Sequence, residues 1–112
     1  MFESLLAIFC LTAILALIAT GGYAQPPIEA FFEASPTAGV MPLEVTFTNL
    51  SWNVDGWHWD FGDGNESDAW SPVHTFDLPG TYLVQLEVWN DTDTDAYGLP
   101  VTVSPLLPVA LF

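Results

Sequence analysis

Neither lysine nor arginine occurs in this chain of 112 residues, which has 14 Asp and Glu residues and a formal net charge of −14. Proteins bind nucleic-acid phosphates mainly through Lys and Arg, so the composition excludes direct nucleic-acid binding and disfavours docking on anionic lipid headgroups. The single Cys excludes an intramolecular disulfide and a cysteine-based zinc cluster. With 51% hydrophobic residues the chain is too apolar to be disordered, and its length allows one domain of about 100 residues.

The N-terminal segment is as poor in polar residues as the rest is in basic ones. Its only charge is Glu3, and between residues 5 and 19 its only polar side chain is Thr12. Leu, Ala and Ile favour a helix here, which the glycine pair at 21–22 would end. A helix that is apolar on all sides has to be buried in lipid or in protein. The segment is therefore a secretory signal peptide, a membrane anchor of short length, or an assembly helix packed against its own copies in a fibre.

Period-two alternation characterises the remainder of the chain. Short runs of alternating apolar and polar residues are separated by turn residues, which predicts about six or seven short strands in an antiparallel β-sandwich. Pro100 has no N–H to donate, so we expect the last strand to be an edge or to be bulged there. The predicted organisation is a hydrophobic helix over 1–24, a stiff linker over 25–27, a sandwich over 28–104 and an apolar tail over 105–112.

Two stretches of the predicted sandwich form a recognisable motif. Its residues are Trp59, Asp60, Phe61, Gly62, Asp63, Gly64, Pro79, Gly80 and Tyr82, with His74, Thr75 and Phe76 between the two stretches. This motif resembles that of the polycystic kidney disease (PKD) domain, an immunoglobulin-like β-sandwich of surface proteins. The resemblance covers residues 28–104 and implies an Ig-like fold in an extracellular or cell-surface module. It further implies a spacer or a mediator of protein or carbohydrate contacts, and it does not imply catalysis.

The chemistry of this motif agrees with a structural role. Trp59 and Phe61 are two residues apart, so they point to the same face of a strand and into the core. Gly62 permits backbone angles that a side chain would oppose, and Asp60 and Asp63 can accept hydrogen bonds from turn amides. A structural hydrogen bond is the favoured interpretation of His74, and we expect the protein not to be an enzyme.

Two loops concentrate acidic residues, one around Asp60 and Asp63 and the other at Asp91, Asp93 and Asp95. Hard oxygen ligands suit Ca²⁺, although neither loop has the spacing of an EF-hand. The alternative interpretation is that these are solvated turn acids whose charge is offset by diffuse counter-ions. Calcium is the only cofactor that the sequence suggests.

Three N-x-[ST] sequons begin at Asn49, Asn65 and Asn90. Each is predicted to lie at a strand end or in a turn, where a glycan could project into solvent. They therefore suggest a glycoprotein, provided that the host has the glycosylation machinery.

Three tryptophans, Trp52, Trp70 and Trp89, fall outside the predicted core. An exposed Trp can stack on a sugar ring or anchor a protein interface. The alternative is that these side chains cover the ends of a small core.

The overall layout, an apolar helix followed by a compact β-sandwich, resembles that of type IV pilin-like filament subunits, archaeal ones in particular. The resemblance implies that helices bundle in a fibre core and Ig-like domains coat the outside. Glu3 would then neutralise a neighbour's N-terminal amine, although the bacterial pattern has Glu at the fifth mature position, where this chain has Leu5. The assembly residues would be Glu3, Leu5, Leu6, Ile8, Phe9, Leu11, Ile14, Leu15, Leu17 and Ile18.

The sequence thus predicts a structural subunit of an extracellular cell-surface filament, a homopolymer that serves adhesion and has acidic PKD-like domains outside. The alternative is a secreted or membrane-tethered PKD module that binds protein or carbohydrate, with residues 1–24 as its signal peptide or anchor. Retention of residues 1–24 together with polymerisation distinguishes the first function from the second.

Overall fold

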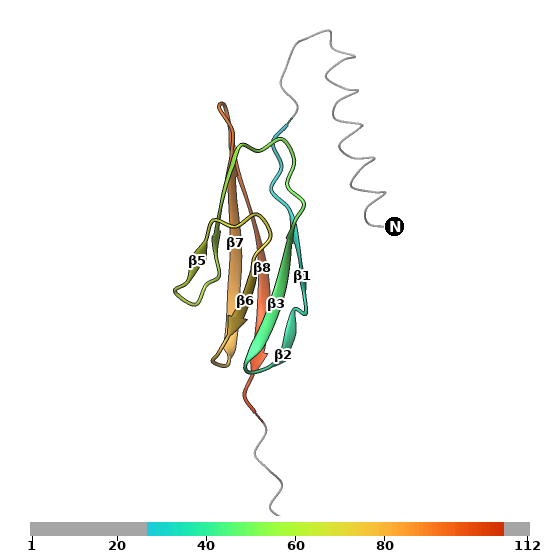
Figure 1. The fold of residues 1–112 in the computed structure, drawn as a ribbon, viewed down its shortest axis with the longest axis vertical. Coiled ribbons are helices and arrows are strands. Elements are labelled where there is room, and N and C mark those ends of the chain that lie inside the picture. The colour runs from blue at the N-terminus through green and yellow to red at the C-terminus, as the bar shows by residue number, and fades with distance from the viewer. Residues whose placement is uncertain (1–26, 107–112) are drawn as a thin grey trace, which may run out of the picture.

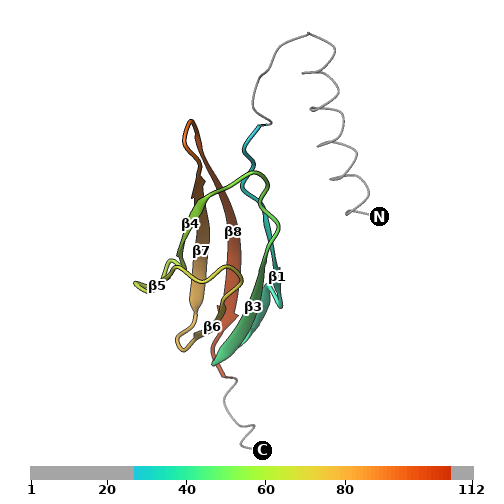
Figure 2. The ribbon, with the colours of Figure 1, turned by 45° about the horizontal axis from the view of Figure 1, so that its top comes forward.

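Alternating side chains build two packed β-sheets in the computed structural model, which describes residues 27–106 (Figure 1). The smaller sheet has the order β1-β3-β6 and the larger one β2-β8-β7-β4-β5. Figure 2 shows the same two layers from a second direction. The strands are β1 (Phe32–Ser35), β2 (Ala38–Val40), β3 (Leu43–Asn49), β4 (Gly56–Asp60), β5 (Glu66–Ser67), β6 (Val73–Phe76), β7 (Gly80–Trp89) and β8 (Thr94–Ser104).

The predicted β-sandwich is confirmed, and no helix occurs within residues 27–106. Accordingly, the described part of the chain contains no helix that is long and apolar enough to cross a membrane. The predicted helix over 1–24, with its assembly residues from Glu3 to Ile18, lies outside the described residues. So does most of the apolar tail predicted over 105–112.

The core lies between the two sheets because every second side chain of each long strand points inward. In β3 the burial alternates without a break, and in β7 Val84, Leu86 and Val88 are all fully buried. Removing this apolar surface from water contributes about 25 cal/mol per Å². The buried apolar residues are Ala30, Phe32, Leu43, Val45, Phe47, Trp59, Phe61, Phe76, Val84, Leu86, Val88, Val101 and Val103.

Trp59 occupies the centre of this core. Its ring centroid lies 4.8 Å from that of Phe32 and 5.4 Å from that of Phe47, so it joins β4 of the larger sheet to β1 and β3 of the smaller one. Its Nε1–H donates to the carbonyl of Ala69 at 2.9 Å. A buried indole needs such an acceptor, and this one fastens the segment after β5 to the core.

The turn after β4 has the geometry that its sequence predicts. Gly62 and Gly64 have φ angles of 81° and 93°, which side chains oppose. A Cβ on Gly62 would also lie 2.6 Å from the carbonyl oxygen of Leu83. The Oδ1 atom of Asp60 accepts from the Gly62 N–H at 2.9 Å, and that of Asp63 accepts from the Asn65 N–H at 3.0 Å.

One strand pair departs from the predicted antiparallel arrangement, because β2 runs parallel to β8 with Ala38 opposite Thr102. Residues 36 and 37 carry the chain from the smaller sheet to the larger one without reversing its direction. The prediction for Pro100 is closer to the structure. β2 covers β8 only from Thr102 onward, so Pro100 has a strand neighbour on one side, namely Leu83 of β7.

The same Leu→Ala substitution, made on each of the two faces of β7, tests the register of this strand. Leu86 is fully buried, whereas Leu83 points to the outer face and is 52% exposed. We expect Leu86→Ala to destabilise the fold by about 2–5 kcal/mol because it leaves a cavity, and Leu83→Ala to cost about 0.5 kcal/mol or less. Urea unfolding of the full chain measures both, and equal losses would contradict the register.

Candidate functional site

Trp89 lies on the outer face of the larger sheet, near the end of β7, and its side chain is 38% exposed. Its register partner on β4 is Gly56. A Cβ at Gly56 would collide with three adjoining atoms of the indole, Nε1, Cε2 and Cζ2. The indole therefore covers the glycine with its face, which leaves ring surface open to solvent.

A polar pocket of about 190 Å³ lies between the β7–β8 hairpin and the β3–β4 loop, and Trp89 is not among the residues that line it. Two of its residues are neighbours of the Trp89–Gly56 pair in the chain, since Asn90 follows Trp89 and Asp55 precedes Gly56. The backbone N–H of Asp55 also donates to the carbonyl of Trp89 at 2.8 Å. The lining residues are Asn53, Asp55, Asn90, Asp91 and Thr92.

Asn90 organises the rim of this pocket. Its Oδ1 accepts hydrogen bonds from the backbone N–H groups of Thr92 and Asp93 at 3.0 and 2.9 Å. Its Nδ2–H donates to the carbonyl of Asn53, 37 residues earlier, at 3.0 Å. These bonds tie the β7–β8 hairpin to the β3–β4 loop, so the pocket is held by both segments and presents mainly carboxylate and amide oxygens.

The three tryptophans predicted to lie outside the core are all exposed, and they serve different surroundings. Trp70 is 41% exposed and packs edge-on against Trp57, with ring centroids 4.7 Å apart. Trp57 in turn donates from Nε1 to the carbonyl of Asp68 at 2.9 Å. Trp70 thus covers an end of the core, and Trp52 forms an isolated bridge with Glu29. Trp89 is the one of the three that lies in a long strand, where its ring faces outward from the larger sheet.

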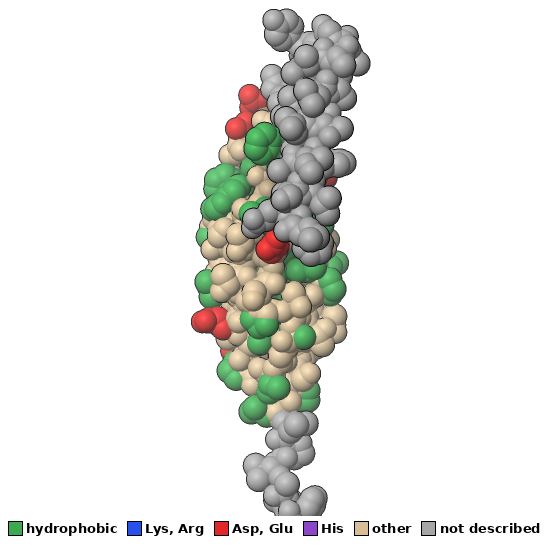
Figure 3. Space-filling model, turned by 90° about the vertical axis from the view of Figure 1, so that its right-hand side faces the viewer, with side chains coloured by type: hydrophobic (Ala, Val, Ile, Leu, Met, Phe, Trp, Pro, Cys, Tyr) green, Lys and Arg blue, Asp and Glu red, His purple; other side chains and the backbone are tan. Residues whose placement is uncertain are grey.

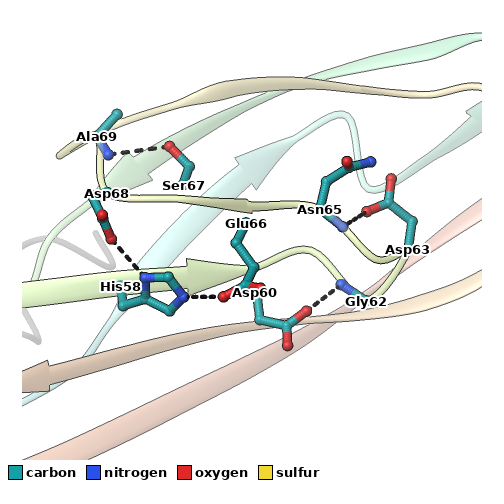
Figure 4. A network of polar contacts seen from close by, with 9 residues as sticks. All are labelled: His58, Asp60, Gly62, Asp63, Asn65, Glu66, Ser67, Asp68 and Ala69. Atoms are coloured by element: carbon teal, nitrogen blue, oxygen red, sulfur yellow. Dashed lines mark hydrogen bonds and ion pairs between the residues drawn. The ribbon is translucent and has the colours of Figure 1, made fainter.

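His58, on the outer face of β4, lies between two carboxylates that follow it in the chain (Figure 4). Its Nδ1 is 2.6 Å from Asp68 Oδ1, and its Nε2 is 2.5 Å from Glu66 Oε1. These hydrogen bonds, the one with Asp68 first, raise the pKa of His58 above its ordinary value. Only the protonated ring can donate to both carboxylates at once, so the charged form holds the two-residue strand β5 against β4.

His74 has the structural hydrogen bond that the sequence predicts. Its Nε2 lies 2.7 Å from Asp63 Oδ2, and its ring stacks on Phe61 with centroids 4.1 Å apart. Burial raises the pKa of Asp63, but hydrogen bonds from His74 and the Asn65 amide outweigh it, and this pKa lies below its ordinary value. The His74–Asp63 pair therefore holds the turn after β4 against the core.

The five calcium candidates are not brought together. Asp60 and Asp63 accept from their own turn amides, and Asp95 accepts from the Ala30 N–H at 2.8 Å through Oδ2. Asp93 accepts from the Thr92 hydroxyl at 3.2 Å, and Asp91 lines the polar pocket. Within residues 27–106, no three His, Cys, Asp or Glu side chains are placed to hold a metal ion. Calcium binding stays a prediction from the sequence.

The predicted projection of Asn49 into solvent is wrong. Asn49 continues the inward series of β3 and is 4% exposed, and its Nδ2 is buried without a hydrogen-bond partner. The fold therefore leaves no room for a glycan on that atom. Asn65 is exposed in its turn, and Asn90 is half-buried with its Nδ2 donating to the carbonyl of Asn53. Of the three sequons, the one at Asn65 has the most exposed asparagine.

Sequence reasoning identified Trp89 and Asp91 but not the pocket between the β7–β8 hairpin and the β3–β4 loop. Asn53 and Asp55 are more than thirty residues from Asn90 in the chain, and only the register of β4 against β7 places them together. The one available signal was Gly56, because a glycine inside a strand marks a close approach of another group.

The His58 contacts predict a pH dependence of stability. Since the folded pKa lies above the unfolded value of about 6.5, the contacts stabilise the fold below that pH. Their contribution is lost as the pH rises through the folded pKa. We expect stability to fall further between about pH 6 and about pH 9 in the wild type than in His58→Gln. The difference should be below about 1 kcal/mol, because the carboxylates are exposed.

Urea titrations of both proteins at each pH measure this difference. His74 and the net negative charge are common to the two proteins, so their effects cancel in the comparison. A pH dependence that is unchanged in His58→Gln would contradict the assignment.

Comparison with known proteins gives this arrangement its family. A crystal structure of the PKD1 domain from the Vibrio cholerae metalloprotease PrtV is similar at 31% identity and a TM-score of 0.59, over 68% of this chain and 95% of that one. A solution structure of a Methanosarcina mazei protein is 37% identical with a TM-score of 0.62, over 74% of this chain and 57% of that one.

A third similar structure comes from work on the promiscuous specificity of carbohydrate-binding modules of the β-sandwich superfamily. It is 29% identical with a TM-score of 0.63 over 70% of this chain, which spans 35% of that one. The sequence profile described as PKD domain matches residues 23–104, most of the length of this chain. The motif turn, the two-sheet core and this match together show that the chain belongs to the PKD-domain family.

Proposed function

We propose that this chain is an extracellular, non-catalytic PKD module that binds carbohydrate through Trp89 on the outer face of the larger sheet. The observation that carries the proposal is the open indole face of Trp89, which is held on Gly56 and is 38% exposed. The indole is not needed to close the core, which lies on the other side of the sheet.

The chemistry of the site suits a sugar ring. A pyranose has an apolar C–H face, which can stack on an indole, and hydroxyl groups around its edge, which need hydrogen-bond partners. Glu87 and Gln85, on the same face of β7 as Trp89, are exposed and supply hydrogen-bonding groups alongside the ring.

The relatives support this class of ligand. One similar structure comes from work on carbohydrate-binding modules, and another is the PKD1 domain of a metalloprotease. PKD domains are generally non-catalytic modules of extracellular proteins, which supports both the location and the absence of enzymatic activity proposed here. A protein is the alternative ligand for the same surface.

We expect Trp89→Ala to weaken glycan binding at least about tenfold, or ~1.4 kcal/mol, because the stacking surface is lost. Trp70→Ala is the matched control, since its exposure of 41% is close to the 38% of Trp89 but its ring packs on Trp57. Calorimetry with hexamers of glucose, mannose, N-acetylglucosamine and glucosamine measures both. The proposal fails if no hexamer binds, or if the two substitutions weaken binding equally.

The filament function stays a prediction, because it depends on residues 1–24, which lie outside the described residues. It is compatible with a carbohydrate-binding domain, since a surface fibre that adheres needs a recognition surface on its outer domain. A polymer of identical helices would be an open, non-closing assembly.

The mass of the intact chain from native cell-surface material tests the filament prediction. We expect a chain that retains residues 1–24, because the assembly helix requires them. Top-down fragmentation is the suitable method, since without Lys or Arg the chain offers trypsin no cleavage site. A mature chain that begins at Gln25 would rule out the assembly stem and leave the binding module alone.

A further inference from the structure

Three asparagines of this chain begin N-x-[ST] sequons, and their surroundings in the fold differ. The side-chain Nδ2 of such an asparagine is the atom to which an N-linked glycan is attached. The chain has no Lys amine that could carry a modification instead, and Figure 3 shows one face of the molecule with red Asp and Glu side chains among green hydrophobic ones and no blue. The surroundings of each asparagine therefore decide which of them a glycosyl transferase can reach.

The sequon at Asn49 is buried at the end of β3. Asn49 is 4% exposed, and it pairs with Phe32 of β1. The hydroxyl of its third residue, Ser51, donates to the carbonyl of Phe31 at 3.3 Å. A transferase could reach neither the amide nor the hydroxyl unless the end of β3 separated from β1.

The sequon at Asn90 is tied into the β7–β8 hairpin. Asn90 is half-buried, and its Nδ2 donates to the carbonyl of Asn53 at 3.0 Å. The hydroxyl of its third residue, Thr92, donates to Asn90 Oδ1 or Asp93 Oδ2, at 3.1 and 3.2 Å. These hydrogen bonds would have to break before both groups of the sequon could enter a transferase.

The sequon at Asn65 is open at both of its groups. The Asn65 side chain is exposed, whereas its backbone N–H donates to Asp63 Oδ1 and its carbonyl accepts from the Phe61 N–H, both at 3.0 Å (Figure 4). The backbone thus fixes the turn without using the amide. The Ser67 hydroxyl accepts from the Ala69 N–H at 3.1 Å, and no group within residues 27–106 accepts from it.

The position of β5 makes this segment accessible along its length. β5 is the last strand of the larger sheet and pairs only with β4, where Glu66 lies opposite Asp60 and Ser67 opposite Trp59. An edge strand leaves its outer backbone groups unpaired. An enzyme can therefore approach residues 65–67 from the outer side without unfolding the sheet.

We infer that Asn65 is an N-glycosylation site of the folded domain, and the one of its three sequons that folding leaves open. In the transfer, Asn65 Nδ2 forms a bond to the anomeric carbon of a sugar, and the bond from that carbon to a phosphate oxygen of a lipid-linked oligosaccharide breaks. Nδ2 loses a proton, and the lipid phosphate leaves with the electron pair of the broken bond. The glycan is attached beyond the end of β4 that is opposite to Gly56 and Trp89, so the inference does not depend on the proposed carbohydrate binding.

Glycan transfer to the folded full chain in detergent tests the site. The chain is made in a host without the pathway and is treated with an oligosaccharyltransferase and a lipid-linked oligosaccharide. The enzyme is one that accepts short peptides with each of the three sequons, so that differences on the chain come from the fold. We expect transfer to Asn65 at least about fivefold faster than to Asn90, where hydrogen bonds must break first. Equal rates at Asn65 and at either other sequon would overturn the inference, as would no transfer to the folded chain.

A matched pair of substitutions tests the dependence on the sequon. Ser67→Ala removes the hydroxyl that the motif requires and should abolish transfer to Asn65, whereas Ser67→Thr retains a hydroxyl and should preserve it. Thr92→Ala removes the sequon at Asn90 and should leave the glycan mass unchanged. Matching urea midpoints would show that the variants are folded. Transfer that persists in Ser67→Ala, or is lost in Thr92→Ala, would contradict the assignment to Asn65.

The chain from native cell-surface material provides the second measurement. Top-down fragmentation locates any glycan mass, and we expect it at Asn65 and not at Asn49 or Asn90. A native chain that is unmodified at Asn65 would overturn the inference, whatever the transferase does with the purified chain.

Discussion

The position of Trp59 is the constraint on which the rest of the domain depends. Its indole fills the centre of the core against Phe32 and Phe47, and its N–H requires the Ala69 carbonyl. These contacts leave β4 one register against β7, because a shift by one residue would turn the indole out of the core. The same register places Gly56 opposite Trp89 and Asp55 beside Asn90. The candidate binding surface is thus set by a residue on the opposite face of its strand.

The absence of basic side chains sets a second constraint, which governs the polar groups. Each acid that the fold needs at a fixed place accepts from a backbone amide or a histidine, as Asp60, Asp63 and Asp95 do. His58 and His74 form ion pairs with acids in the described part of the chain. Other acids, such as Glu44 and Asp77, are exposed to solvent and counter-ions. Because salt screens charges mainly beyond about 8–10 Å at ordinary ionic strength, such a surface stays selective at short range for the sign of a ligand's charge.

Much of the architecture could be predicted from local rules, and the exceptions are long-range. Alternation in β3 and β7 reports burial directly, and the glycines and acids after Trp59 specify their own turn. The parallel pairing of β2 with β8 depends on where the chain crosses between sheets, which no local pattern encodes. The same holds for the pocket, since its two loops meet only through the β4–β7 register.

Asn49 is a different kind of error, because the relevant signal was present. Leu43, Val45 and Phe47 already define the inward face of β3, and the next residue in that series is Asn49. The sequon indicated a surface position and the periodicity indicated a buried one. Burial decides here because the strand continues through residue 49 and pairs with Phe32. A three-residue motif carries less structural information than a seven-residue alternation.

Trp89 and Gly56 can be weighed in the same physical terms. A glycine inside a strand costs about 0.5–1 kcal/mol, and an aromatic ring laid across it recovers part of that loss by covering the backbone. Such a stabilising pair accounts for the covered face of the indole. It does not account for the 38% of the side chain that stays exposed. An aliphatic pair would hold the two strands together without exposing an indole to water. The open ring is therefore better explained by what binds to it than by what it stabilises.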